Sequence, residues 1–112
     1  METKETEFQW NTVKVYGNIE AHDPGIVTRS GWEGAADRSE LEEGMNLKDV
    51  IKEESWEHNR GYFSVVWLHQ MRPDGVTVRV GERLIEIPAG QCKTVLEEGL
   101  SYAVGYISVR VE

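Results

Sequence analysis

The segment VTVRVGERLIEI, which runs from Val76 to Ile87, constrains the fold more than any other, because it has the pattern of a complete β-hairpin. Glycine at the first position of a two-residue loop favours a type II′ turn, so Gly81 and Glu82 are expected to join two antiparallel strands. In the register set by that turn, apolar residues of the two strands share one face of the hairpin. The expected pairs are Val80 with Arg83, Val78 with Ile85, and Val76 with Ile87. The second face, which carries Arg79 and Glu86, is expected to contact water.

Further strands are predicted on both sides of this hairpin. The sequence RPDG at residues 72–75 fits a type I turn and predicts a preceding strand over residues 61–71. Because that strand is apolar on both faces, it is expected to lie in the centre of a sheet. The turn PAGQ at residues 88–91 separates the hairpin from two more expected strands, at residues 92–96 and 102–111.

The N-terminal strand shows a change of phase. Phe8 and Trp10 share one parity, whereas Val13 and Val15 share the other, which predicts a β-bulge near Asn11. Six strands joined mostly by short turns are expected to pair with their neighbours along the chain. The expected fold is therefore mainly β: a single-domain antiparallel meander that closes as a small barrel or sandwich.

A different kind of sequence connects the first and second expected strands. The 112 residues suit a single domain, so residues 1–112 are taken as one β-rich unit with a flexible N-terminus at 1–7. Residues 21–60 are expected to form an acidic loop and a short helical insertion. The early part, His22–Arg38, is rich in Gly and Ala, and a connection of that length is usually functional or mobile.

The helical part of the insertion carries two start signals. Ser39 and Glu42 fit a capping box, and Asn46 can cap a second helix. In that second helix Leu47, Val50 and Ile51 share one face, and Trp56 lies on the opposite side. Either the helix stops near residue 54 and Trp56 packs inward, or the helix continues and Trp56 faces solvent or a partner.

Charge narrows the class of partner. The chain has 20 Asp and Glu against 12 Lys and Arg, a net charge of −8, and residues 33–60 hold nine of the acids and four of the bases. Such a field repels nucleic-acid phosphates and anionic lipid surfaces and attracts a basic protein. With no signal-peptide pattern, no membrane-length apolar run and a single cysteine, the expected location is the cytoplasm, including assembly there into a larger particle.

No constellation typical of catalysis or metal binding stands out. His22, His58 and His69 have no partner at a diagnostic metal-ligand spacing. Cys92 lacks a nucleophile signature and is expected to be a small buried thiol. We therefore expect no catalytic residue, no cofactor and no metal site, and we do not expect an enzyme.

The leading hypothesis is a non-enzymatic protein–protein interaction protein. It would be a small accessory or structural subunit of a larger assembly, such as a virion-type or other multiprotein complex. Its expected partner is another protein with a basic surface, or copies of itself, without direct contact to nucleic acid or membrane. Tryptophan is a favoured interface anchor. Trp10 and Trp67 lie in strand patterns and are expected to be internal, so the expected partner-binding residues are Trp32, Trp56, Glu42, Glu43, Asp49, Glu53 and Glu57.

Two other functions compete with this hypothesis. The acidic residues of the insertion suit an inhibitor or immunity-type protein that masks a basic active site or mimics nucleic-acid phosphates, and such binding weakens with salt. These residues are Glu40, Glu42, Glu43, Asp49, Glu53, Glu54 and Glu57. The third hypothesis is a small ligand-binding barrel or hydrolase, which would use side chains of the insertion. Those side chains are His22, Asp23, Glu54 and His58.

Overall fold

The computed structural model describes residues 7–23, 26–50, 64–100 and 103–112, with side chains described for all of these except 18–23, 26–32, 98–100 and 103–104. This part of the chain forms seven β-strands and two short 3-10 turns. The strands are β1 (Thr12–Asp23), β2 (Ile26–Asp37), β3 (Val66–Arg72), β4 (Gly75–Val80), β5 (Arg83–Pro88), β6 (Cys92–Leu100) and β7 (Ala103–Val111). The 3-10 turns are η1 (Arg38–Glu40) and η2 (Leu47–Val50).

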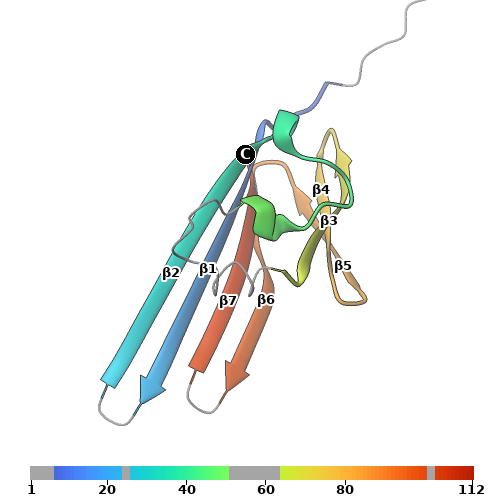
Figure 1. Ribbon diagram of the computed structural model, residues 1–112. Coiled ribbons are helices and arrows are strands. Elements are labelled where there is room, and N and C mark those ends of the chain that lie inside the picture. Colours follow the sequence, from blue (N-terminus) through green and yellow to red (C-terminus); the bar gives the residue numbers. More distant parts are fainter. Residues whose placement is uncertain (1–6, 24–25, 51–63, 101–102) are drawn as a thin grey trace, which may run out of the picture.

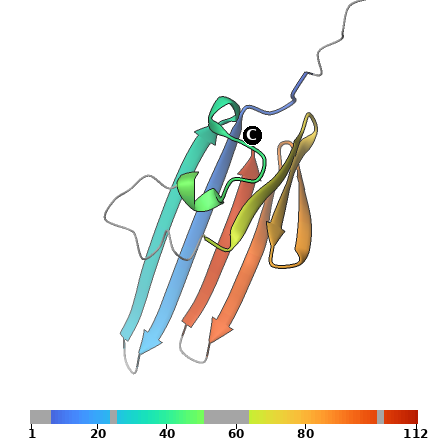
Figure 2. The ribbon, with the colours of Figure 1, turned by 45° about the vertical axis from the view of Figure 1, so that its right-hand side comes forward.

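The strands make two separate antiparallel sheets. The larger sheet has the order β2-β1-β7-β6, and the smaller has the order β3-β4-β5. In Figures 1 and 2 the smaller sheet lies at one end of the larger one, whose strands extend well beyond it. The mainly β, antiparallel prediction is confirmed, but the seven described strands do not close a barrel.

The chain leaves the smaller sheet at residues 88–91, which explains why the meander does not continue into a barrel. Pro88 cannot donate a ladder hydrogen bond, and Gly90 takes a φ of +85°. The Gly90 amide then donates to the Val111 carbonyl at 2.7 Å. This bond brings the chain to the larger sheet, where β6 pairs with β7.

Side chains from both sheets and from the 3-10 turns form one core. Trp10 is central to it, because its buried ring donates from Nε1 to the Arg72 carbonyl at 2.7 Å while its backbone leads into β1. The buried members are Trp10, Val13, Val15, Ala36, Leu41, Leu47, Val50, Val66, Leu68, Val76, Val78, Val80, Ile87, Val95, Ile107, Val109 and Val111. The two sheets are therefore packed as one body.

The predicted bulge near Asn11 is confirmed. The amides of Asn11 and Thr12 both donate to the Glu112 carbonyl, at 2.7 and 2.8 Å, so two residues of one strand face one residue of the other. This extra residue changes the phase of the strand. Trp10 and Val13, which differ in parity, are consequently both buried.

The central hairpin has the predicted register. Val80 faces Arg83, Val78 faces Ile85, and Val76 faces Ile87. Gly81 has a φ of +63°, and no described non-glycine residue has positive φ, as a type II′ turn requires. The second face differs from expectation at Thr77, which is buried.

The predicted loop over His22–Arg38 is wrong, because most of it forms β2. That strand pairs with β1 in an unbroken antiparallel register from Asp37 opposite Thr12 to Ile26 opposite Asp23. The Gly and Ala residues that looked like loop elements are strand residues. Gly34 lies opposite Val15 and Ala36 lies opposite Val13.

In the described part of the predicted insertion, the helical elements are two 3-10 turns. The first begins after Asp37, whose amide donates to Glu40 Oε1 at 3.2 Å, so the cap lies two residues before the predicted Ser39. The predicted cap at Asn46 is confirmed, because its Oδ1 accepts a hydrogen bond from the Lys48 amide at 2.9 Å. The predicted face of Leu47 and Val50 is buried, whereas Ile51 lies outside the described residues.

Three burial or position predictions in the second half are wrong. The strand expected to be central, β3, lies at the edge of the smaller sheet, and β4 is central. Trp67 is 36% exposed rather than internal, and Cys92 is exposed rather than buried. The register of β3 with β4 shifts between Leu68 and Gln70, and this shift leaves His69 on the exposed side.

Candidate protein-interaction surface

Several of the predicted contact residues fall outside what the structure describes. Trp56, Glu53 and Glu57 lie in the segment 51–63, so their predicted role stays a prediction. Trp32 is described through its backbone, which lies opposite Gly17 in the pairing of β2 with β1. Whether these residues share one surface with Glu42, Glu43 and Asp49 therefore stays a prediction.

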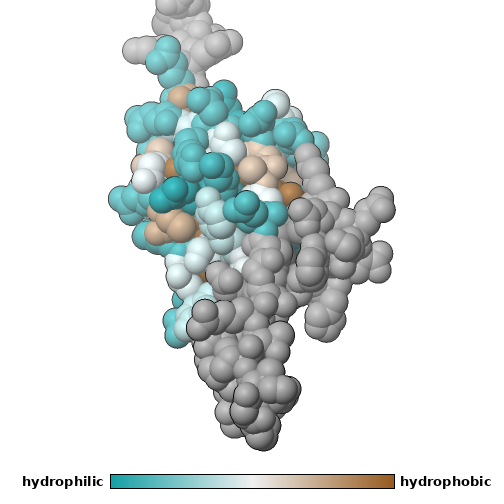
Figure 3. Space-filling model, turned by 90° about the vertical axis from the view of Figure 1, so that its left-hand side faces the viewer, coloured by the Kyte–Doolittle hydropathy of each residue, from teal (hydrophilic) through white to brown (hydrophobic). Residues whose placement is uncertain are grey.

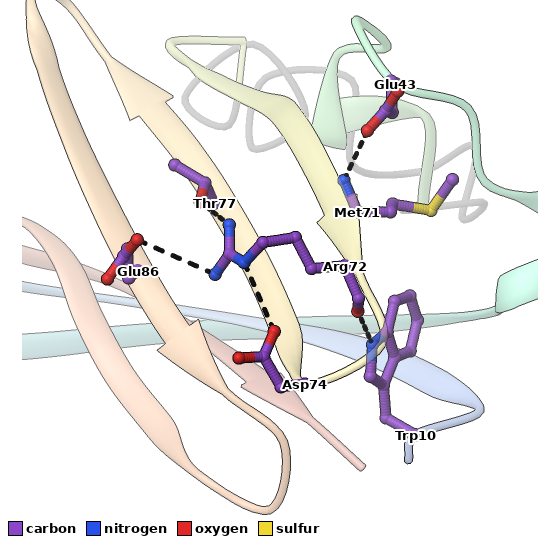
Figure 4. A network of polar contacts seen from close by, with 7 residues as sticks. All are labelled: Trp10, Glu43, Met71, Arg72, Asp74, Thr77 and Glu86. Atoms are coloured by element: carbon purple, nitrogen blue, oxygen red, sulfur yellow. Dashed lines mark hydrogen bonds and ion pairs between the residues drawn. The ribbon is translucent and has the colours of Figure 1, made fainter. Parts of the chain in front are cut away.

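The three predicted acidic contact residues that the structure describes lie on the segment between β2 and β3. Glu42, Glu43 and Asp49 are all exposed. The Glu43 carboxylate is engaged within the chain, because its Oε2 accepts a hydrogen bond from the Met71 amide of β3 at 2.8 Å (Figure 4). This carboxylate thus satisfies a donor at the edge of the smaller sheet.

The same segment covers the outer edge of β3 with backbone hydrogen bonds. The Gly44 amide donates to the Leu68 carbonyl at 2.6 Å, and the Leu68 amide donates to the Met45 carbonyl at 2.9 Å. Asn46 adds a hydrogen bond from Nδ2 to the Ser64 carbonyl at 2.7 Å. The acidic segment has a structural role in protecting this edge, which sequence reasoning missed.

An exposed row of side chains crosses the outer face of the smaller sheet. Trp67 faces Arg79 across β3 and β4, and Arg79 faces Leu84 across β4 and β5. We call these three residues the Trp67 row. All three are exposed, and the Arg79 guanidinium carbon lies 5.8 Å from the centroid of the Trp67 ring. The row joins an aromatic ring, a cation stacked against it and an apolar side chain.

The exposure of its apolar side chains and its residue composition make the Trp67 row a candidate interface. Leu84 is 56% exposed, and Val65, which has the same parity as Trp67, is also exposed. Interfaces are enriched in Trp and Arg and depleted in Lys and Glu at their centres. The opposition of Arg79 and Leu84 was predictable from the hairpin register, but the place of Trp67 beside Arg79 needed the pairing of β3 with β4.

A polar network lies beside the row on the same face. The Arg72 guanidinium donates to Thr77 Oγ1 and to Asp74 Oδ1, the latter at 3.3 Å, and its Nη2 lies 3.9 Å from Glu86 Oε1 (Figure 4). These contacts bury Thr77 and connect the three strands. Beside the Trp67 row, polar side chains of β3, β4 and β5 therefore contact one another on the same face of the sheet.

In the larger sheet, Lys14 of β1 forms an ion pair with Glu112, which follows β7. Lys14 Nζ lies 3.1 Å from Glu112 Oε1, and Arg110 Nη1 lies 3.7 Å from the same oxygen. The hydrogen bond and charge of Glu112 raise the pKa of Lys14 above its ordinary value. These exposed ion pairs join β1 to the strand beside it, and pairs of this kind contribute little to stability.

Within the described ranges, no group of three or more His, Cys, Asp or Glu side chains is placed to hold a metal ion. The side chains of His22 and Asp23 are not described, and Glu54 and His58 lie in the segment 51–63. No helix in the described part of the chain has the length and apolar character needed to cross a membrane. The hypothesis of a ligand-binding barrel or hydrolase, which depends on these four side chains, therefore stays a prediction.

Comparison with known proteins gives no family to which this chain can be assigned: it matches no protein-family model, no curated protein and no solved structure.

Proposed function

We propose that this protein is a non-enzymatic interaction subunit that docks onto another protein within a larger assembly. The observation that carries the proposal is the Trp67 row, in which a large aromatic ring and an apolar side chain are exposed on one face of the smaller sheet. A tryptophan on a strand loses little conformational entropy on binding and offers a large contact area. The row therefore has the composition of an interface centre.

The surroundings of the Trp67 row support docking rather than a ligand cavity. Its members come from three adjacent strands, so they form a continuous patch. Arg79 can remain stacked on Trp67 while its remaining N–H groups bond a partner carboxylate or carbonyl. Such a patch suits a flat protein surface with an apolar centre and acceptors around it.

The test uses the full chain in an extract of the cells that produce it. The wild-type chain is expected to migrate in a complex larger than itself, and Trp67→Ala or Leu84→Asp is expected to migrate as the free chain. Glu82→Ala, in the exposed turn of the same sheet, is the matched control and should leave the complex intact. Variants of the Trp67 row that stay folded by circular dichroism and remain in the complex would contradict the proposal.

Salt separates this proposal from the acidic-inhibitor hypothesis. A complex held through the exposed carboxylates of Glu42 and Asp49 should dissociate as ionic strength rises. A complex centred on Trp67 and Leu84 should persist, because apolar burial is only weakly affected by moderate salt. Repeating the migration experiment at about 50 mM and about 500 mM salt, on either side of the physiological screening range, distinguishes the two.

A further inference from the structure

The edges of the two sheets are not equally protected against pairing with another chain. The outer edge of β3 is covered by Gly44 and Met45, and β6 has a register shift between Thr94 and Leu96. The edge strand β5 is short and ends in Pro88. Covered edges, bulges, short strands and proline are the devices by which proteins prevent edge-to-edge association.

Among the residues that the structure describes, the strand β2 carries none of these devices. It is 12 residues long, contains no proline, and pairs with β1 without a register shift. It is the last strand of its sheet among the described residues and lies at the outer side of that sheet in both ribbon views (Figures 1 and 2). A long, regular edge of this kind is a template for strand addition.

Hydrogen bonds at the end of the sheet show which backbone groups of β2 face outward. Thr12 and Glu112 exchange two backbone hydrogen bonds at 2.8 Å each, so the backbone N–H and C=O of Thr12 point toward the β7 side. The next residue, Val13, must then face β2, where it pairs with Ala36. The even-numbered residues of β2 therefore bond to β1, and the odd-numbered residues direct their N–H and C=O groups outward.

We propose that β2 pairs with β2 of a second copy of this chain, antiparallel and centred on Gly31, to form a symmetric dimer with a continuous eight-stranded sheet. Gly31 would face Gly31 of the second copy, and Arg29 would face Glu33 of that copy. A two-fold axis then repeats the Arg29–Glu33 pair on the other side of the centre. The inference rests on the proposed function for its premise that the chain works by docking, and it names a copy of itself as one partner.

Charge selects this register over its neighbours. Centring the pair on Arg29 would place two Arg29 residues opposite each other, and centring it on Glu33 would place two Glu33 residues opposite each other beside pairs of Arg29 with Asp37. Centring it on Ser30 or Trp32 would place Arg29 and Glu33 opposite uncharged residues. Centring on Gly31 puts opposite charges together twice and leaves the central position without a side chain. Of these registers, the one centred on Gly31 pairs Arg29 with Glu33 twice and places neither residue opposite a copy of itself, although each chain has a net charge of −8.

The character of this side of the molecule fits association through the backbone and paired charges. Figure 3 faces the side on which β2 lies, and its coloured residues are mostly hydrophilic, with a few apolar spots. Glu33, Ala35 and Asp37 of β2 are exposed. A hydrophilic surface beside a long, regular edge strand favours strand pairing over apolar docking.

Charge reversal tests the register. The mass of the purified wild-type chain, measured by sedimentation velocity over a range of concentration, should be that of a dimer. Arg29→Glu and Glu33→Arg each replace two attractive pairs by two repulsive ones, so each should weaken the dimer by about tenfold or more. The double variant R29E/E33R restores opposite charges across the axis and should restore the dimer. Glu97→Arg, on the exposed edge strand β6, is the control and should leave the dimer unchanged.

A second variant tests the backbone contact without altering charge. Because the Gly31 N–H points away from β1, Gly31→Pro removes a donor to the second copy and none from the β1–β2 pairing. This variant should be a folded monomer by circular dichroism and sedimentation. A wild-type chain that is monomeric at all concentrations, or a dimer indifferent to both single charge reversals, would overturn the inference.

The two proposals fail separately. A monomeric chain that still needs Trp67 and Leu84 to join its assembly would overturn the β2 dimer and leave the proposed function standing. A dimer that follows the charge-reversal pattern, while variants of the Trp67 row join the assembly normally, would overturn the role of that row and keep the β2 dimer.

Discussion

Gly75 shows how one residue without a side chain lets two strands of the smaller sheet approach. It follows the turn formed by Pro73 and Asp74 and pairs with Pro88 at the end of β5. A β-carbon built at Gly75 would overlap the Ile87 carbonyl oxygen and lie 2.9 Å from the Pro88 α-carbon. Both atoms belong to the backbone, so no side-chain movement can relieve the overlap.

Replacing Gly75 by alanine is therefore expected to destabilise the protein more than the same change at Gly90. Gly90 has a φ of +85°, and a β-carbon added there would meet no atom within 4 Å, so Gly90→Ala costs only backbone strain, about 1–2 kcal/mol. Gly75→Ala adds steric overlap, typically about 1–3 kcal/mol. Urea unfolding followed by circular dichroism measures both free energies, and equal losses of stability would contradict this account.

At the level of elements, the segment between β2 and β3 shows how a charged stretch becomes part of a sheet. Glu43 accepts from the Met71 amide, and Gly44 and Met45 pair with Leu68. An edge strand with bonded donors is a poor template for another chain. The acidic segment thus protects one edge, whereas β2 keeps a regular one.

Removing the Glu43 carboxylate should expose the Met71 amide to solvent exchange. A hydrogen bond to a charged group contributes about 1.5–3 kcal/mol, so Glu43→Ala should accelerate hydrogen–deuterium exchange at Met71 by about tenfold or more where exchange proceeds by local opening. Glu42→Ala, in the neighbouring exposed position, is the control and should leave that rate unchanged. Residue-resolved exchange by NMR gives the comparison, and equal rates in the two variants would contradict the assigned bond.

Which elements could be predicted from sequence depends on how local their determinants are. The hairpin around Gly81, the cap at Asn46 and the bulge near Asn11 depend on residues within a few positions, and all three predictions are confirmed. The strand β2 was missed because its Gly and Ala residues are stabilised by pairing with β1 rather than by their own propensity. Trp67 was misplaced for a related reason, because its exposure depends on which face of the smaller sheet the rest of the molecule covers.

The candidate site was predicted less well than the fold because it depends on neighbours far apart in sequence. The sequence favoured tryptophans outside strand patterns, but the described exposed tryptophan, Trp67, lies within a strand. Parity alone cannot say which face of a strand is covered by another sheet. The Trp67 row became visible only when β3, β4 and β5 were placed side by side.

At the scale of the whole molecule, the two proposed contact regions lie at different sides of one packed body. Figure 1 shows β2 at one side of the larger sheet and the smaller sheet at the other. The core between them includes Trp10, which hydrogen-bonds to the smaller sheet while its chain continues into the larger one. A dimer through β2 would therefore leave both Trp67 rows available to further partners.

This shared core predicts that the two sheets unfold as one unit. Leu68 in the smaller sheet and Val109 in the larger are both fully buried. Leu68→Ala should lower the unfolding free energy by about 2–5 kcal/mol, because it removes buried methyl groups and leaves a cavity. Since the sheets share that core, Leu68→Ala and Val109→Ala should each shift the urea unfolding transition. The transition followed by far-ultraviolet circular dichroism should coincide with the one followed by tryptophan fluorescence.

Leu84→Ala is the control and should change stability by less than about 0.5 kcal/mol, since Leu84 is mostly exposed. Two separate transitions, with Leu68→Ala shifting only one, would mean that the sheets fold independently and that Trp10 does not couple them.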